Sequence, residues 1–331
     1  MIRSLYHYLK RVARQSIAGW DKFWFAPKCA TNIGFARISL GTIAAIYAAS
    51  WISDLHTWIG NEGRLNVEVT RYLIGDGLAG TGSAGRLSPL YGIESALWIR
   101  IYLVVTMLSS IAMVLGLGGR LAAMLSWVLT LGIIHRIPML QGAGELLFTG
   151  IMGYLIIDPG KVRCWSRIGF ADQQSRWTAS LSLRLMQCHV VVWFAISILS
   201  HFAEPMWWSG TATWWLAIGQ RSPWLSQDFL SDKPYLMNVF SHGFLAIHLV
   251  ALILLVCKGC RLLAIGACLL MAMSVWILAG DWMYGLALVG STACFWGTAI
   301  KELGIVPFDG KEVEASVPSQ EFRYHLSPRA E

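Results

Sequence analysis

Charged residues are scarce in this sequence: they make up 14% of its 331 positions, while 56% of the positions are hydrophobic. A soluble domain carries roughly a quarter of charged residues, so this composition disfavours an ordinary water-soluble fold. The sequence also lacks a G-x-S-x-G turn, a Walker loop and an H-E-x-x-H motif. Each of these motifs sets catalytic or phosphate-binding groups in a fixed local geometry. Their absence gives no support to hydrolase or nucleotide chemistry.

Metal and disulfide signals are equally weak. The seven cysteines mostly fall in or beside hydrophobic runs and form no secreted-type framework. A single C-x-x-C at 257–260 has no second pair, so we interpret it as a tight turn rather than half a zinc site. His189 and His201 are twelve residues apart, and His242 and His248 are six apart. Neither pair has the i, i+4 spacing of a helical metal site, so we predict no metal.

Long hydrophobic runs are what the sequence has instead. They are roughly as long as the 17–25 residues that a bilayer requires of a helix. They are continuous rather than alternating, which favours helices over a closed barrel. The sequence therefore predicts an all-α, polytopic transmembrane helix bundle of about eight spans. The expected spans lie near 33–53, 94–116, 119–135, 143–158, 182–202, 236–257, 260–280 and 283–300.

The distribution of lysine and arginine predicts the orientation. With eight spans and the N-terminus inside, 17 of the 26 basic residues fall on the inner side, 6 on the outer side and the rest in helix ends. Cytoplasmic loops carry such an excess of basic residues in membrane proteins. We therefore expect both termini in the cytoplasm, and we attribute the net charge of +7 to this asymmetry rather than to nucleic-acid binding.

Three regions and two outer segments follow from this topology. We expect a basic amphipathic segment at 1–29 along the cytoplasmic membrane surface, a transmembrane domain at 30–300 and a polar cytoplasmic tail at 301–331. The outer segment 54–93 is glycine-rich, but no strand precedes its glycines, so we expect a flexible loop rather than a phosphate site. The outer segment 203–235 is rich in tryptophan, a residue that favours the membrane–water interface.

Four polar residues are expected near the outer leaflet: His135, Arg136, Glu145 and His201. Ionisable groups inside spans are costly and usually face the bundle interior. One hypothesis is a polar pocket for an anionic or quinone-like head group, and the alternative is a structural ion pair between Arg136 and Glu145 that closes a hairpin. The polar residues expected to be structural within the membrane are Arg37 and His189.

Three stretches of the sequence form a pattern with a fixed order. The first is GFARISLG at 34–41. The second, at 115–160, has a Gly-x-x-x-Arg-Leu entry, an Arg-x-Pro helix end and a closing Asp-Pro-Gly. In the third, a helix is followed by Trp-x-x-Gly-Thr-Ala at 207–212. Together they resemble the HTTM family, the membrane domain that vitamin K-dependent γ-glutamyl carboxylases share with many bacterial proteins. The resemblance covers about residues 30–300 and implies a bacterial inner (plasma) membrane protein.

The resemblance also implies a chemistry. In the carboxylases a reduced vitamin K is deprotonated and oxidised, and a lysine at a helix end is associated with its deprotonation. Here His201 stands at the matching position, and 142–145 differ from the Asn-His of the family's loop. The resemblance therefore implies the membrane fold and a reduced-quinone or lipid pocket lined by Trp207 and Gly210, while the two differences argue against carboxylase activity and leave open whether the protein is an enzyme. Histidine remains suited to proton transfer, because its unperturbed pKa is about 6.5.

Two function classes stay open. The first is a lipid or quinone pocket near the outer leaflet, with His201 as a catalytic base and Arg136 and Glu145 as anchors. The second is a non-enzymatic membrane partner in the export or maturation of a peptide, which contacts a peptide or protein through 203–224. Transport is a weaker third hypothesis, because the span centres hold almost no acidic groups.

Overall fold

The structure, a computed structural model, describes residues 2–26, 31–60, 63–66, 68–70, 72, 88–93, 95–137, 141–160, 177–219, 227–257 and 259–303. Within these ranges the regular elements are all helical, and no strand occurs. The short elements η1 (Pro89–Gly92) and η3 (Tyr154–Ile156) are 3₁₀ helices. The α-helices are α1 (Ile2–Phe25), α2 (Thr31–Trp58), α4 (Ala96–Leu115), α5 (Gly119–Arg136), α6 (Ala143–Gly153), α7 (Trp177–Ala203), α8 (Pro205–Trp208), α9 (Ala212–Gly219), α10 (Gln227–Ser231), α11 (Pro234–Val256), α12 (Arg261–Ala279) and α13 (Trp282–Glu302).

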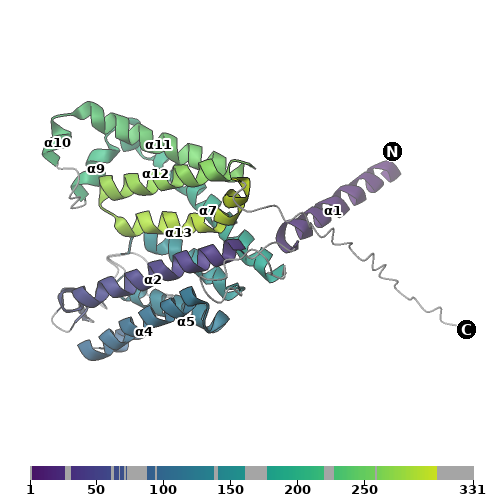
Figure 1. The fold of residues 1–331 in the computed structure, drawn as a ribbon. Helices are drawn as coiled ribbons and strands as arrows, with labels where there is room; N and C mark the ends of the chain where they lie inside the picture. Colours follow the sequence, from purple (N-terminus) through teal and green to yellow (C-terminus); the bar gives the residue numbers. More distant parts are fainter. Residues whose placement is uncertain are drawn as a thin grey trace, which may run out of the picture.

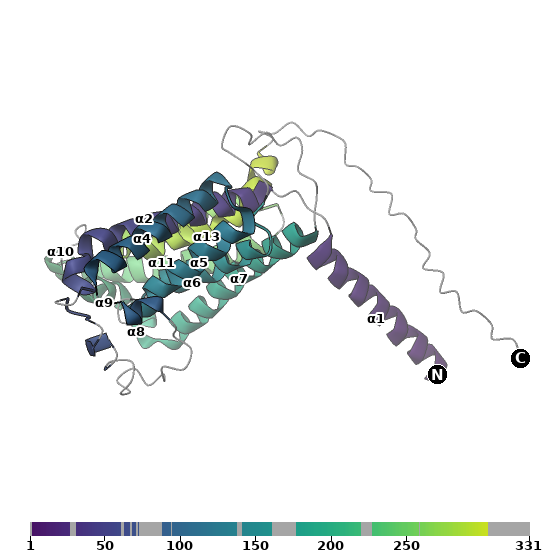
Figure 2. The same cartoon turned by 90° about the horizontal axis from the view of Figure 1, so that it is seen from below.

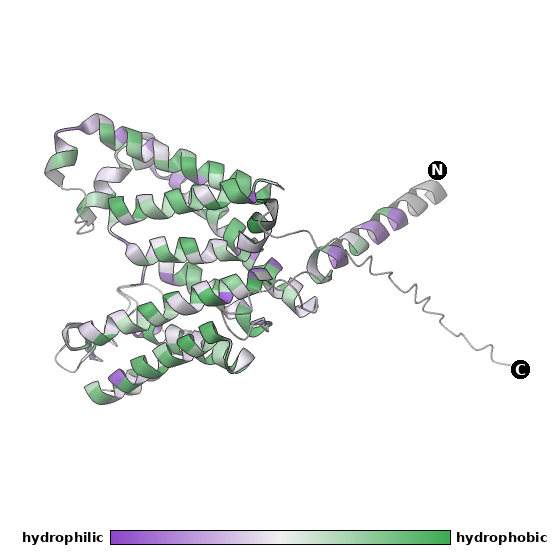
Figure 3. Cartoon of the chain, viewed as in Figure 1, coloured by the Kyte–Doolittle hydropathy of each residue, from purple (hydrophilic) through white to green (hydrophobic). Residues whose placement is uncertain are grey.

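Six of the described helices are long and apolar enough to cross a membrane: α2, α4, α7, α11, α12 and α13. This finding supports the prediction of a helical, multi-pass membrane protein. Helices also occupy the other two predicted spans. However, α5 carries charged groups near both of its ends, and the apolar stretch of α6 and η3 is short, at Ala143–Ile156. Figure 3 shows how strongly apolar residues dominate the bundle helices.

Helix α13 lies at the centre of the bundle (Figure 1). It packs against α2, α6, α7 and α12, and its apolar window is the most buried of the six. Small residues allow these close contacts, as they do between membrane helices generally. A Cβ on Gly144 of α6 would lie 2.7 Å from the backbone of Tyr284 in α13. The start of α6 is therefore held directly against the start of α13.

The chain enters and leaves the bundle at the same end. Asn32 in the first turn of α2 donates a hydrogen bond to Thr298 near the end of α13, at 3.1 Å. We call this the entry end, and we call the opposite end, which contains Trp207 and Asp281, the far end. Figure 2 shows α8 and α9 at the far end, away from α1. Because the chain enters and leaves at one end, the number of membrane passes is even if all the bundle helices span the membrane. These are α2, α4, α5, α6, α7, α11, α12 and α13.

Helix α1 extends away from the bundle (Figures 1 and 2). It is joined to α7 at the entry end, where Ser180 donates to the carbonyl of Ala26 at 2.7 Å and the rings of Phe25 and Trp177 meet edge-on. The predicted amphipathic segment at 1–29 is thus helical over most of its length. The glycine-rich stretch at 75–85 and the tail from 304 to 331 lie outside the described residues.

Candidate functional site

A cavity of about 310 Å³ lies at the far end of the bundle. Side chains from α7, α8, α9, α11, α12 and α13 line it, together with the first residue of α6. Its volume is near the lower limit of small-molecule sites, which measure about 300–1,000 Å³. Most of its lining is apolar, and its polar side chains are Ser197, His201, Asp281 and Tyr284. A cavity of this size and character suits a ring-sized head group with one or two polar atoms.

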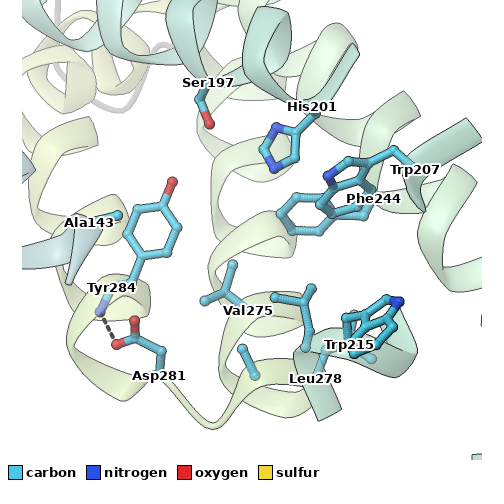
Figure 4. Close-up of a pocket in the computed structure, with 12 residues that line it drawn as sticks. Ala143, Ser197, His201, Trp207, Trp215, Phe244, Val275, Leu278, Asp281 and Tyr284 are labelled. Carbon is cyan, nitrogen blue, oxygen red and sulfur yellow. Dashed lines mark hydrogen bonds between the residues drawn. The ribbon is translucent and has the colours of Figure 1, made fainter. Parts of the chain in front are cut away.

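His201, the candidate base, lines this cavity (Figure 4). Its ring is enclosed by aromatic neighbours: the ring centroid of Trp207 is 4.3 Å away and that of Phe244 is 5.8 Å away. Its Nδ1 is buried near the backbone of Ser197, one turn earlier, without a well-aligned hydrogen bond. Both ring contacts are T-shaped, so the imidazole of His201 is packed edge-to-face among the aromatic rings that line this side of the cavity.

A second histidine, His248 of α11, lies beside His201 and is fully buried. The two ring centroids are 5.3 Å apart. The Nε2 of His248 donates to the carbonyl of Phe194 at 3.2 Å, because a carbonyl oxygen can only accept. Its Nδ1 is buried without a partner. Two adjacent imidazolium groups would repel each other. His248 therefore has to stay neutral when His201 takes up a second ring proton and becomes positively charged.

Tyr284 and Asp281 form the opposite side of the cavity (Figure 4). Asp281 precedes α13 and its carboxylate accepts a hydrogen bond from the backbone N–H of Tyr284 at 2.8 Å, as in a helix N-cap. The hydroxyl of Tyr284 accepts a longer bond from the indole of Trp193, at 3.4 Å. In Figure 4 this hydroxyl points toward Ser197, on the α7 side of the cavity. The cavity therefore has an imidazole on one side and a phenol on the other.

Glu145 does not line the cavity but lies next to it. Its carboxylate accepts a hydrogen bond from the N–H of Gly142 at 3.0 Å and so caps the start of α6. Gly142 has no Cβ, and that absent atom would lie 3.1 Å from a Glu145 oxygen and 3.6 Å from an Asp281 oxygen. Glycine at this position thus lets the two carboxylates approach the same point. An ion pair between Glu145 and Arg136, considered from the sequence, is not formed.

Arg136 has other partners. It is completely buried and donates to the hydroxyl of Thr70 at 2.5 Å and to the carbonyl of Leu65 at 3.0 Å. It therefore ties the end of α5 to the segment that follows α2. The neighbouring His135 is half-buried, and its carbonyl accepts a hydrogen bond from Tyr91 at 2.6 Å. Neither Arg136 nor His135 lines the cavity.

The two candidates from the tryptophan-rich outer segment, Trp207 and Gly210, take different positions relative to the cavity. Trp207 is buried, lines the cavity and stacks on Phe244, with centroids 5.3 Å apart. Gly210 lies in the turn after α8 with a φ of +73°, where a Cβ would overlap the side chain of Asn238. Its carbonyl accepts a hydrogen bond from Ser241 at 3.0 Å. Gly210 therefore shapes the turn that presents Trp207, rather than contacting a ligand in the cavity.

The two polar residues expected to be structural lie away from the cavity. Arg37 is buried at the entry end and donates to the carbonyl of Pro159 at 3.3 Å. His189 hydrogen-bonds Tyr154 at 3.2 Å, and its ring occupies the space left by Gly150, where a Cβ would lie 2.6 Å from it.

Cysteines and metal ligands contribute nothing further to this site. The cysteines at 257 and 260 are free thiols in the α11–α12 turn. Over the described ranges, no group of three or more histidine, cysteine, aspartate or glutamate side chains is arranged to hold a metal ion.

The helices that form the site belong to an all-helical bundle of the kind found in multi-pass membrane proteins. Comparisons with family models, with curated proteins and with solved structures find no match. The chemical character of the site therefore follows from its geometry alone.

Sequence reasoning found His201 and Trp207 but missed the other polar groups that accompany them. From the sequence Asp281 was assigned only to the start of a link between spans, although an aspartate directly before an apolar run is the pattern of a helix N-cap. His248 could not be paired with His201, because the two lie on different helices. Tyr284 carries no local signal, since tyrosine is common near the ends of membrane helices.

Proposed function

We propose that this chain is a multi-pass inner-membrane protein of the HTTM type and that its far-end cavity binds the head group of a quinone-like lipid. In this proposal the eight helices of the bundle cross the membrane, both termini are cytoplasmic, and the far end faces outward. The observation that carries the proposal is His201 lining a mostly apolar cavity opposite Tyr284. A hydroxylated aromatic ring complements this lining, because it is flat, apolar on its faces and polar at its edges.

The chain's own residues account for binding and for one proton transfer. Trp207, Phe244 and Trp215 supply aromatic surfaces that pack against the ring of the ligand. The imidazole of His201 accepts the proton of a ring hydroxyl and becomes an imidazolium enclosed by aromatic rings. Tyr284 donates or accepts a hydrogen bond at the other edge of the ligand. A reduced quinone supplies the acidic hydroxyl in this scheme. Carboxylation is not part of it, because His201 stands where the resemblance places a lysine.

Binding of a small naphthoquinol to the purified full-length protein tests this function. Equilibrium dialysis across a pH series should show saturable binding to the wild type that changes with the protonation of a single group. His201→Gln should weaken binding by roughly tenfold, the equivalent of one hydrogen bond, and remove the pH dependence. The matched control is His242→Gln: this histidine lies at the same end, is exposed and does not line the cavity. Equal binding by the two variants would refute the proposed function.

A second candidate, a membrane partner for a peptide, is favoured by exposed aromatic surface at the far end. Trp208 is 60% exposed and stacks on Phe202, with centroids 5.4 Å apart. Trp208 does not line the cavity, so the two functions can be separated. In a strain with a phenotype that depends on this protein, Trp208→Ala and His201→Gln should be compared at equal membrane levels. Loss of the phenotype only in Trp208→Ala would favour the peptide partner over the quinone pocket.

A further inference from the structure

Two arginine side chains adjoin the same part of α13 at the entry end of the bundle, far from the cavity. Arg184 belongs to the second turn of α7, and Arg261 is the first residue of α12. Arg184 reaches Cys294 through Gln187, and Arg261 lies against Phe295, the next residue. A chain of contacts joins them: Arg184 donates to Gln187 at 3.1 Å, and Gln187 donates to the carbonyl of Cys294, the residue before Phe295, at 3.1 Å. Arg261 lies over the ring of Phe295 at 4.8 Å.

This pair of charges has no acidic partner among the described residues. Arg184 contacts the side chain of Gln187 and the ring of Phe23, which is 4.6 Å from its guanidinium carbon. Its Nε is buried without a hydrogen-bond partner. Arg261 donates to the carbonyl of Leu255. Two cations that adjoin each other without a carboxylate repel, and a bound anion would relieve this repulsion.

The residues around the two arginines indicate which class of anion would suit them. Leu262 and Leu263 follow Arg261 directly and are 44% and 63% exposed, so exposed apolar side chains lie at the same end of α12 as Arg261. Helix α1 ends beside Arg184, and it carries several basic residues, among them Arg11, Arg14 and Lys22, against one acidic residue. Figure 3 shows that the coloured part of α1 mixes hydrophilic and hydrophobic residues, unlike the mostly apolar helices of the bundle. A charged edge that borders an apolar face matches a phospholipid, whose phosphate lies next to its acyl chains.

We propose that Arg184 and Arg261 bind the phosphate of an anionic phospholipid in the cytoplasmic leaflet. Guanidinium groups present their N–H donors in a planar fork that matches two phosphate oxygens. The acyl chains of the lipid lie along the exposed leucines at the start of α12. The ring of Phe23 contacts one guanidinium group and the buried ring of Phe295 contacts the other, which restricts the positions of both groups. The bound lipid also fixes the end of α1 at the membrane surface.

Lipid titration of the delipidated full-length protein, followed by native mass spectrometry, tests this proposal. Phosphatidylglycerol should bind at least about tenfold more tightly than phosphatidylcholine, since two basic residues contact the extra charge. Arg184→Gln/Arg261→Gln should abolish that preference, whereas Arg184→Lys/Arg261→Lys should retain part of it. The matched control is Arg120→Gln, an exposed arginine at the start of α5 that should leave the preference unchanged. Each variant is first checked for a single gel-filtration peak.

Several outcomes would overturn the proposal. One is a wild-type protein that does not discriminate between the two lipids, and another is a double glutamine variant that still prefers phosphatidylglycerol. Displacement of the lipid by inorganic phosphate at concentrations that leave bulk vesicles intact would assign the site to a free anion instead. If the double glutamine variant does not fold, the salt dependence of lipid binding by the wild type provides the test. Added salt should weaken the binding of phosphatidylglycerol and leave the binding of phosphatidylcholine unchanged. Naphthoquinol binding at the far end is independent of all these results.

Discussion

The contact between the starts of α6 and α13 is the part of the site whose energetics can be worked out most directly. Gly144 faces the backbone of Tyr284, and a Cβ there would lie 2.7 Å from its N and Cα and 3.0 Å from the carbonyl carbon of Met283. These are backbone atoms, so no side-chain rotation can relieve the overlap. Gly144→Ala therefore forces the two helices apart, and overpacking of this kind typically costs about 1–3 kcal/mol.

The intrinsic preference of alanine for helices works in the opposite direction. Replacing a helical glycine by alanine stabilises a helix by about 0.5–1 kcal/mol where space is available. Gly243 in α11 and Gly266 in α12 have such space, because nothing lies within 4 Å of the position of their Cβ. They are the matched controls: Gly243→Ala and Gly266→Ala should be neutral or stabilising, and Gly144→Ala should lie below both by roughly 1–3 kcal/mol.

Thermal unfolding of the purified proteins in one detergent measures this difference. At roughly 2–4 °C per kcal/mol, the Tm of Gly144→Ala should fall at least about 2–4 °C below the Tm of Gly266→Ala. Because Tyr284 lines the cavity, Gly144→Ala should also weaken naphthoquinol binding, which Gly266→Ala should not affect. Equal Tm values for the two variants would show that α6 and α13 are not in contact at Gly144, and the geometry of the cavity would then be wrong.

Three further substitutions probe the elements around the cavity. Arg136→Met should lower the free energy of unfolding by about 3 kcal/mol or more, because two hydrogen bonds from a buried charge are lost, and Arg136→Lys should restore only part of it. Ser241→Ala should lower the free energy of unfolding by about 1–3 kcal/mol in the same assay. The Ser241 hydroxyl donates to the carbonyl of Gly210 and accepts from the N–H of Thr213, and alanine would leave both backbone groups without this partner. Asp281→Ala should cost about 1 kcal/mol through loss of the α13 cap, whereas Asp281→Asn should be nearly neutral. An Asp281→Asn variant as unstable as Asp281→Ala would show that the charge of this residue, not its cap, is what stabilises the helix.

The helices were predictable because their signal is local. A run of apolar residues long enough to cross a bilayer must form a helix, since no other open structure satisfies its backbone in lipid. Each of the eight predicted ranges therefore contains a helix, and Gly116 and Gly280 end two of them in left-handed conformations of +74° and +65°. The α5 and α6 regions differ from the other six because charged residues and short length reduce their apolar character.

The polar groups of the site were only partly predictable. The position of His201 beside Trp207 follows from one short stretch of chain, in which a helix ends and a turn begins. The anchors expected from the same leaflet, Arg136 and Glu145, take separate partners instead. Sharing a membrane face does not bring two side chains together, because each is free to satisfy its hydrogen bonds with the nearest loop or helix end.

By itself, the sequence determined that this protein is a bundle of membrane-length helices with a histidine at the end of one of them. Only the tertiary structure decided what faces that histidine: a second histidine from α11, a tyrosine and an aspartate from the start of α13, and three aromatic rings from α8, α9 and α11. It also brought arginines from α7 and α12 to the same part of α13 at the opposite end. The physical reason is the same in both cases. The length of an apolar run is a property of one continuous segment of sequence. A binding site, by contrast, depends on how several segments rotate and pack against one another.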